Sequence, residues 1–158
     1  MIVSVLPYVH ILTAALVVGK VALLSFVVAP CLAKTLEREP FRNVVRELFP
    51  AYYAFGAGAA VAGFLSVAAL SLVRGVDSGL LAAGILWLFI LSAESYCRSW
   101  LTPRSNAMRD QLNELGRQGA QDSLLQSAWD RLHRRSVHLN SLVLIAGLCV
   151  LGLAMGFQ

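Results

Sequence analysis

The chain has 158 residues, of which 58% are hydrophobic and 14% are charged, and its formal net charge is +4. Soluble domains contain fewer apolar and more charged residues, so the composition predicts one integral membrane domain over residues 1–158. The positive charges gather in two segments between apolar runs. This is typical of membrane topology and argues against nucleic acid as a partner.

Four apolar runs are long enough to cross a bilayer as helices, which takes about 20 residues each. They cover residues 6–29, 51–73, 79–101 and 137–157. The sequence therefore predicts an all-α fold. We expect an integral membrane four-helix bundle with an interfacial helix and a cytoplasmic helical extension in its two longer connections.

The first run is interrupted by polar residues on one side only. At about 100° per residue, His10, Thr13 and Lys20 fall within one narrow stripe. Lys20 lies past the middle of the span, where a lysine costs about 2.5–3.5 kcal/mol even on the most lenient insertion scale. We therefore expect this stripe to face protein or water, sheltered by the other spans.

The first long connection contains an apolar helical face between Pro40 and Pro50. The residues of this face recur at helical spacing: Phe41, Val44, Val45, Leu48 and Phe49. Pro40 suits the first turn of a helix, and Pro50 favours its end. We expect a short helix over 41–49 that lies in the membrane interface; the alternative is a plain connector.

Small residues recur at four-residue spacing in the second run, where Gly56 precedes Ala60 and Ala59 precedes Gly63. This spacing lets helix backbones approach each other closely. It predicts helix packing, either within the protein or between copies of it.

Glu94 is the acidic residue of the third run, at a depth that resembles the depth of Lys20. Two pairings are open: an inter-helix pair with Lys20, or a pair with Arg98 at i+4 on the same helix. Ionisable residues inside a membrane are candidate functional residues by default. Lys20 and Glu94 are therefore our candidate intramembrane polar pair.

The second long connection, residues 102–136, is polar but helical in pattern, and Gly116 and Gly119 divide it. Its second half should run straight into the fourth span as one helix that projects into the cytoplasm. One apolar stripe of this half consists of Leu125, Ala128, Trp129 and Leu132. We expect the stripe to pack on the first half; the alternative is a partner protein.

Both long connections are rich in basic residues, so the positive-inside rule puts them in the cytoplasm and both termini outside it. This predicts a multi-pass protein of the bacterial inner (plasma) membrane. We also expect an aromatic belt at the two membrane surfaces. It would place Tyr8 at the outer surface and Tyr52, Tyr53, Tyr96 and Trp100 at the inner one.

His10 is the candidate ligand of the first span, because a neutral imidazole can bind haem iron or copper. Met155, near the outer end of the fourth span, lies at a similar depth, and its thioether suits haem b or Cu(I). The two side chains would form a cofactor-binding site. In the alternative, His10 is only hydrogen-bonded near the interface.

A second group of candidates surrounds the inner end of the fourth span. It consists of Arg131, His133, Arg134, Arg135, His138 and Asn140. We interpret this group as a cytoplasmic basic collar that sets topology and binds lipid headgroups. The alternative is an anion or cofactor site that faces the cytoplasm.

Several short motifs, in their order and spacing, resemble those of a known family. They are Val9-His10, Gly19, Leu48-Phe49-Pro50-x-Tyr52, Trp100-Leu101-x-Pro103-Arg104 and Leu132-His133-x-x-Ser136-x-x-x-Asn140. Over nearly the whole chain, the sequence resembles a bacterial member of the transmembrane protein 205-like family of four-span proteins. Lys20 and Glu94 do not belong to the pattern of that family.

The resemblance implies little about function. The animal member is associated with tolerance of platinum drugs, so a role in metal or drug tolerance is implied. The layout is also distantly similar to copper-resistance D-type proteins and HemJ-type protoporphyrinogen oxidases, which place a histidine in an early span. That second likeness is an analogy of layout.

The sequence contains no nucleophile elbow, P-loop, paired-carboxylate site or zinc motif, so we expect no catalysis by side chains alone. We expect a non-enzymatic accessory or assembly component of a membrane complex, or a protein of metal or drug tolerance. Its partners would be the lipid bilayer and other membrane subunits or copies of itself. The alternative is a haem- or copper-binding membrane redox protein that uses His10, with the cofactor supplying the chemistry.

Overall fold

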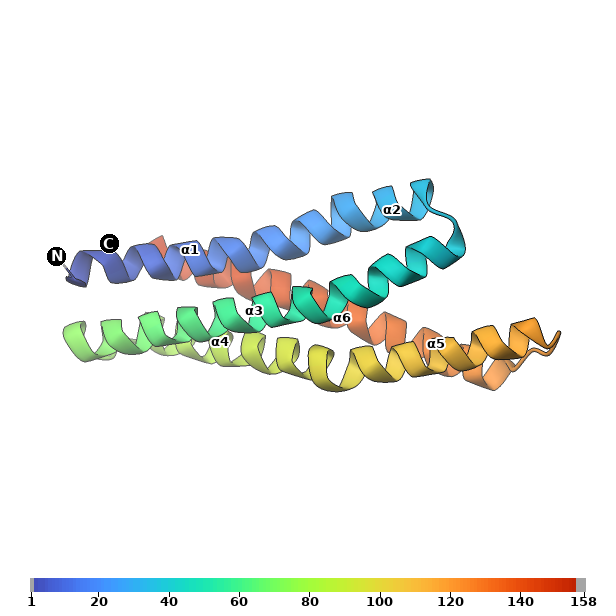
Figure 1. Ribbon diagram of the computed structural model, residues 1–158. Helices are drawn as coiled ribbons and strands as arrows, with labels where there is room; N and C mark the ends of the chain where they lie inside the picture. The colour runs from blue at the N-terminus through green and yellow to red at the C-terminus, as the bar shows by residue number, and fades with distance from the viewer. Residues whose placement is uncertain (1, 156–158) are drawn as a thin grey trace.

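The computed structural model describes residues 2–155, and every regular element in that range is helical (Figure 1). The elements are α1 (Ile2–Leu23), η1 (Leu24–Val28), α2 (Ala29–Thr35), α3 (Arg38–Arg74), α4 (Ser78–Tyr96), η2 (Cys97–Leu101), α5 (Thr102–Arg117) and α6 (Ser123–Ala154). Because η1 and η2 are π-helical turns that join their neighbours, the chain forms four long rods: α1–η1–α2, α3, α4–η2–α5 and α6.

Within the described residues, all four rods are long and apolar enough to cross a membrane. This confirms the predicted all-α, four-helix membrane bundle. The last two residues of the predicted fourth span, 156 and 157, lie outside the described residues.

Each rod runs antiparallel to the two rods beside it (Figure 1). The start of α1, the α3–α4 turn and the end of α6 lie at one end of the bundle, while the α2–α3 link and the α5–α6 hairpin lie toward the other (Figure 1). Both α1 and α4 pack against α3 and α6. The helices α1 and α4 are therefore diagonal partners, and their side chains meet across the centre of the bundle.

Two rods continue through prolines by means of π-helical turns. Pro30 follows η1 and Pro103 follows η2. A proline ring inside an α-helix clashes with the carbonyl four residues earlier and lacks the N–H that this carbonyl would accept. The wider π turn just before each proline accommodates the ring, so each rod continues instead of breaking.

The predicted separate interfacial helix is wrong. Residues 41–49 are the first part of α3, a 37-residue helix that contains Pro50 in its interior. The missing N–H of Pro50 removes one backbone hydrogen bond, but contacts with α5 hold the preceding turns in line with the span. Arg42 donates a hydrogen bond to Asn113, and Arg46 forms an ion pair with Asp110.

The hairpin between α5 and α6 forms at the predicted glycines. Gly119 has a φ of +72°, a left-handed conformation that glycine adopts without strain. The next helix begins after Asp122, whose side chain accepts a hydrogen bond from the Leu125 backbone N–H at 2.9 Å.

The last helix runs unbroken from the hairpin through the fourth span, as predicted. Its 32 residues correspond to about 48 Å, which exceeds a hydrocarbon core of about 30 Å. The predicted packing of its apolar stripe on the first half of the connection is also seen. Arg109 of α5 lies over the Trp129 ring, with its guanidinium carbon 5.2 Å from the ring centroid.

The small residues of the second span face the inside of the bundle. Gly56, Ala59, Ala60 and Gly63 are all buried, so their spacing serves packing within the chain. At Gly63, an added Cβ would overlap the ring of Trp87, which is fully buried on α4. The glycine therefore creates the space that this indole fills.

We expect Gly63→Ala to lower the free energy of unfolding by about 1–3 kcal/mol, because the rigid indole cannot give way without moving a helix. The matched control is Gly58→Ala on the same helix, where the new Cβ meets no atom within 4 Å. This control should stay within about 1 kcal/mol of the wild type. Reversible unfolding in detergent micelles measures both; equal effects would contradict the assigned role of Gly63.

Candidate functional site

A buried ion pair joins the two diagonal helices. Lys20 Nζ of α1 lies 2.6 Å from Glu94 Oε1 of α4, and the two side chains are 7% and 1% exposed. Removing two charges from water is costly unless they pair closely and are otherwise hydrogen-bonded. The short distance between the two groups provides the pairing.

The Lys20 ammonium has a third neighbour on α3. It donates a long hydrogen bond of 3.4 Å to the Tyr52 carbonyl and lies 3.8 Å from the centroid of the Tyr52 ring. A cation over an aromatic face gains electrostatic attraction, and more so when both groups are withdrawn from water. Three of the four rods therefore take part in holding this one charge.

Gly56 makes room for the pair. A Cβ at this position would overlap both Lys20 Nζ and the Glu94 carboxyl group. Glu94 Oε2 is buried beside it and has no hydrogen-bond partner among the described residues. Sequence reasoning identified Gly56 only as a packing residue; the four-residue spacing gave no sign that the neighbours would be charged.

The structure distinguishes the two pairings that the sequence left open for Glu94. Arg98 is exposed and lines a hollow beside Pro50 and Thr102, whereas Glu94 is turned into the bundle toward Lys20. The π turn η2 begins at Cys97, between Glu94 and Arg98.

A second polar cluster joins α3 to α6. The Tyr52 hydroxyl donates to Asn140 Oδ1 at 3.0 Å, and Asn140 Nδ2 donates to the Tyr53 hydroxyl at 3.1 Å. Tyr53 also shares a hydrogen bond of 3.0 Å with the Ser136 hydroxyl. Tyr52 and Tyr53 are only 9% and 1% exposed, so their rings face the inside of the bundle and not the lipid headgroups. Their expected depth at the inner membrane surface stays a prediction.

His10 lies in a third cluster, nearer the end of the bundle where the chain begins. It is fully buried, and Trp87 Nε1 of α4 donates a long hydrogen bond of 3.4 Å to its Nδ1. The Ser66 hydroxyl of α3 also lies 3.4 Å from Nδ1. Thr13 is buried one turn further along, so the predicted polar stripe of the first span does face protein.

Met155 lies at the C-terminal cap of α6 and is 79% exposed. His10 contacts Ser66 of α3, Trp87 of α4 and the Val150 backbone of α6. Among residues 2–155, no group of three or more His, Cys, Asp and Glu side chains could hold a metal ion. A ligand pair of His10 and Met155 stays a prediction.

The residues of the predicted basic collar do not converge on one site. Arg131, His133, Arg134, Arg135 and His138 are exposed on α6, whereas Asn140 turns into the tyrosine cluster. His133 stacks on Trp129 with ring centroids 5.4 Å apart, and Arg135 lies over Tyr96. These contacts spread the basic groups along and around the helix.

Four apolar rods with polar groups turned inward define a multi-pass helical membrane protein. Residues 12–114, well over half of the chain, match the family described as Domain of unknown function (DUF4149), and the chain belongs to that family. The matched stretch contains Lys20 and Glu94. No curated protein and no solved structure matches the chain. A likeness to transmembrane protein 205-like, copper-resistance D-type or HemJ-type proteins is not shown.

Removing either member of the ion pair alone leaves an uncompensated buried charge. We expect Lys20→Met and Glu94→Gln each to lower the free energy of unfolding by about 3–5 kcal/mol. In the double variant, the free energy of unfolding should fall by much less than the sum of the two single losses. Arg98→Gln, on the same rod but exposed, is the control and should change little.

Unfolding in detergent micelles measures all four variants as a double-mutant cycle. Strict additivity of Lys20→Met and Glu94→Gln would mean that the two groups do not stabilise each other.

Proposed function

We propose that this protein is a non-enzymatic component of the bacterial plasma membrane, an accessory or assembly subunit of a larger membrane complex. The observation that carries the proposal is that polar groups of the spans bind one another. Lys20 binds Glu94 across the bundle, and Tyr52 and Tyr53 bind Asn140 of α6. Groups engaged in this way hold helices in register, which is a structural task.

The outer surface of the rods supports the same proposal. Large apolar side chains are exposed on all four rods, among them Leu12, Phe55, Leu65, Ile85 and Ile145. Such a surface suits lipid tails, and it equally suits apolar helices of other subunits or of further copies of this chain. A role in metal or drug tolerance would then be exerted through such an assembly.

The proposed orientation puts the hairpin end in the cytoplasm and both termini outside it. The basic connections lie at the hairpin end, and the α3–α4 turn lies at the other (Figure 1). Basic residues close to span ends set topology.

Topology reporters fused within 74–78 and within 116–119 should report opposite sides of the membrane, with 116–119 inside. The physical reason is that the arginines of the hairpin end resist translocation. The reverse pattern would overturn the orientation but not the fold.

The functional proposal predicts that the protein migrates in a defined complex larger than one chain. The test solubilises membranes gently, separates complexes on native gels and identifies their subunits by mass spectrometry. In cells that lack the protein, the same complex should lose subunits or abundance. A protein that migrates only as a single chain, with no complex altered in its absence, would contradict the proposal.

The optical spectrum of the same purified material tests the alternative of a haem- or copper-binding redox protein. If only the structural role is present, His10→Ala changes no spectrum and costs about 1 kcal/mol of stability through its lost hydrogen bonds. A stoichiometric cofactor that His10→Ala abolishes, and that Met155→Leu shifts, would replace the proposal by that alternative.

A further inference from the structure

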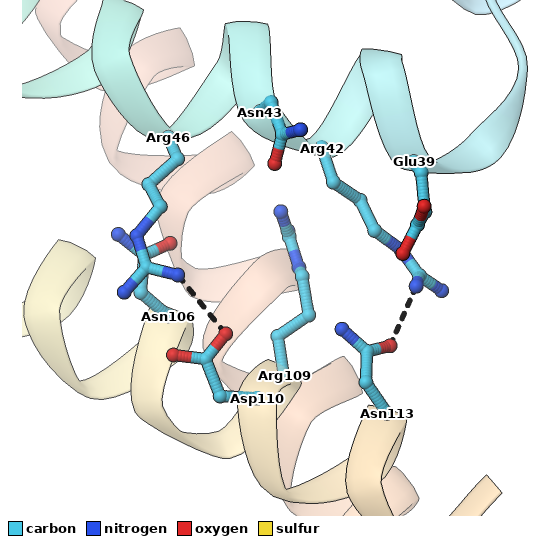
Figure 2. A pocket seen from close by; sticks show the side chains of 8 residues that line it. All are labelled: Glu39, Arg42, Asn43, Arg46, Asn106, Arg109, Asp110 and Asn113. Carbon is cyan, nitrogen blue, oxygen red and sulfur yellow. Dashed lines mark hydrogen bonds and ion pairs between the residues drawn. The ribbon is translucent and has the colours of Figure 1, made fainter. Parts of the chain in front are cut away.

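A polar hollow lies between the first turns of α3 and the middle of α5 (Figure 2). Three arginines and three asparagines form most of its wall: Arg42, Arg46, Arg109, Asn43, Asn106 and Asn113. We call this hollow, together with its continuation described below, the arginine groove. It lies beyond the predicted ends of the second and third spans.

The arginine groove is thus separate from the buried clusters of the bundle core, and no residue of those clusters lines it.

The positive charge of the groove is only partly neutralised. Arg46 Nη1 lies 3.0 Å from Asp110 Oδ1, which is an ion pair, but Arg42 donates at 2.6 Å to the neutral amide of Asn113. Glu39 also lines the hollow, yet its described ion pair, at 3.8 Å, is with Arg117.

Arg109 is the central cation. Figure 2 shows its guanidinium between Arg42 and Arg46, pointing toward Asn43. Its described contact is with the Trp129 ring, and no carboxylate lies within ion-pair distance of it among residues 2–155. Like charges this close repel each other, so the arrangement favours an anion between them.

The groove also offers neutral donors and space. The side-chain amides of Asn43 and Asn106 make no hydrogen bond within the described part of the chain. The hollow has a volume of about 60 Å³, whereas one water molecule needs about 10–15 Å³ by this kind of measure. A small polyatomic anion therefore fits.

We propose that the arginine groove binds a phosphate group, carried by the headgroup of an anionic phospholipid. Guanidinium groups present planar pairs of N–H donors that match the oxygens of a phosphate, and amide N–H groups supply further donors. This assignment is independent of the membrane complex proposed above.

A second hollow indicates that the phosphate comes from a lipid. It has a volume of about 410 Å³ and shares Arg46, Asn106 and Asp110 with the first. From there it continues past Pro50 and Pro103, at the predicted ends of two spans, where lipid headgroups lie. A free phosphate ion would use only the first hollow, whereas a phospholipid would place its phosphate there and its glycerol and chains along the second.

The test reconstitutes the full-length protein in nanodiscs of phosphatidylcholine that contain a minor fraction of phosphatidylglycerol, and native mass spectrometry counts the lipids retained. The wild type should retain phosphatidylglycerol in preference to phosphatidylcholine. Arg109→Gln should weaken this preference about tenfold, because it removes a charge-assisted contact. Arg38→Gln, which removes the same charge from an exposed position on α3 that lines neither hollow, is the matched control and should leave it unchanged.

Asn43→Asp is the second variant, because that side chain makes no described hydrogen bond and its loss should not affect folding. A carboxylate there should repel the phosphate and weaken retention as Arg109→Gln does. A parallel arm titrates the lipid-free protein in neutral detergent with inorganic phosphate. Retention of phosphatidylglycerol without measurable phosphate binding supports the lipid source. Binding of inorganic phosphate as strong as the binding of the lipid overturns the lipid source. Equal losses of phosphatidylglycerol retention in Arg109→Gln and Arg38→Gln overturn the site.

Discussion

The ion pair between Lys20 and Glu94 constrains the whole bundle, because it is formed by helices that do not pack side by side. Its 2.6 Å distance requires α1 and α4 to present these groups at the same depth and toward the same central point. It also requires α3 to carry a residue without a side chain at Gly56. A shift of any of these three helices by one turn would separate the charges and leave both in a medium that solvates neither.

Much of this arrangement could be predicted from the sequence. The stripe of His10, Thr13 and Lys20 follows from helical periodicity, and the matching depth of Glu94 follows from counting residues along two spans. The four long helices follow from the length of the apolar runs, and the hairpin follows from Gly116 and Gly119. These features depend on the local sequence or on the thickness of the bilayer, so a single sequence is enough to predict them.

The remaining features depend on which helices are neighbours. Pro50 would end an isolated helix. In this structure α3 continues through it, because Arg42 and Arg46, which precede Pro50, bind residues of α5. Tyr52 and Tyr53 look like interfacial aromatic residues until Asn140 of α6 is placed against them. The arginine groove is likewise assembled from two helices whose individual patterns show only solvent-facing basic and polar residues.

The π turn η2 affects which faces of the third rod, α4–η2–α5, contact its neighbours. Each residue advances an α-helix by about 100°, so the one extra residue of a π turn rotates everything beyond it by roughly that angle. The face of α4 that carries Glu94 into the bundle is therefore out of phase with the face of α5 that carries Arg109 and Asp110. The rod α4–η2–α5 is one continuous helix whose contact faces differ on the two sides of η2. Its two ends can therefore pack on different neighbours without a loop between them.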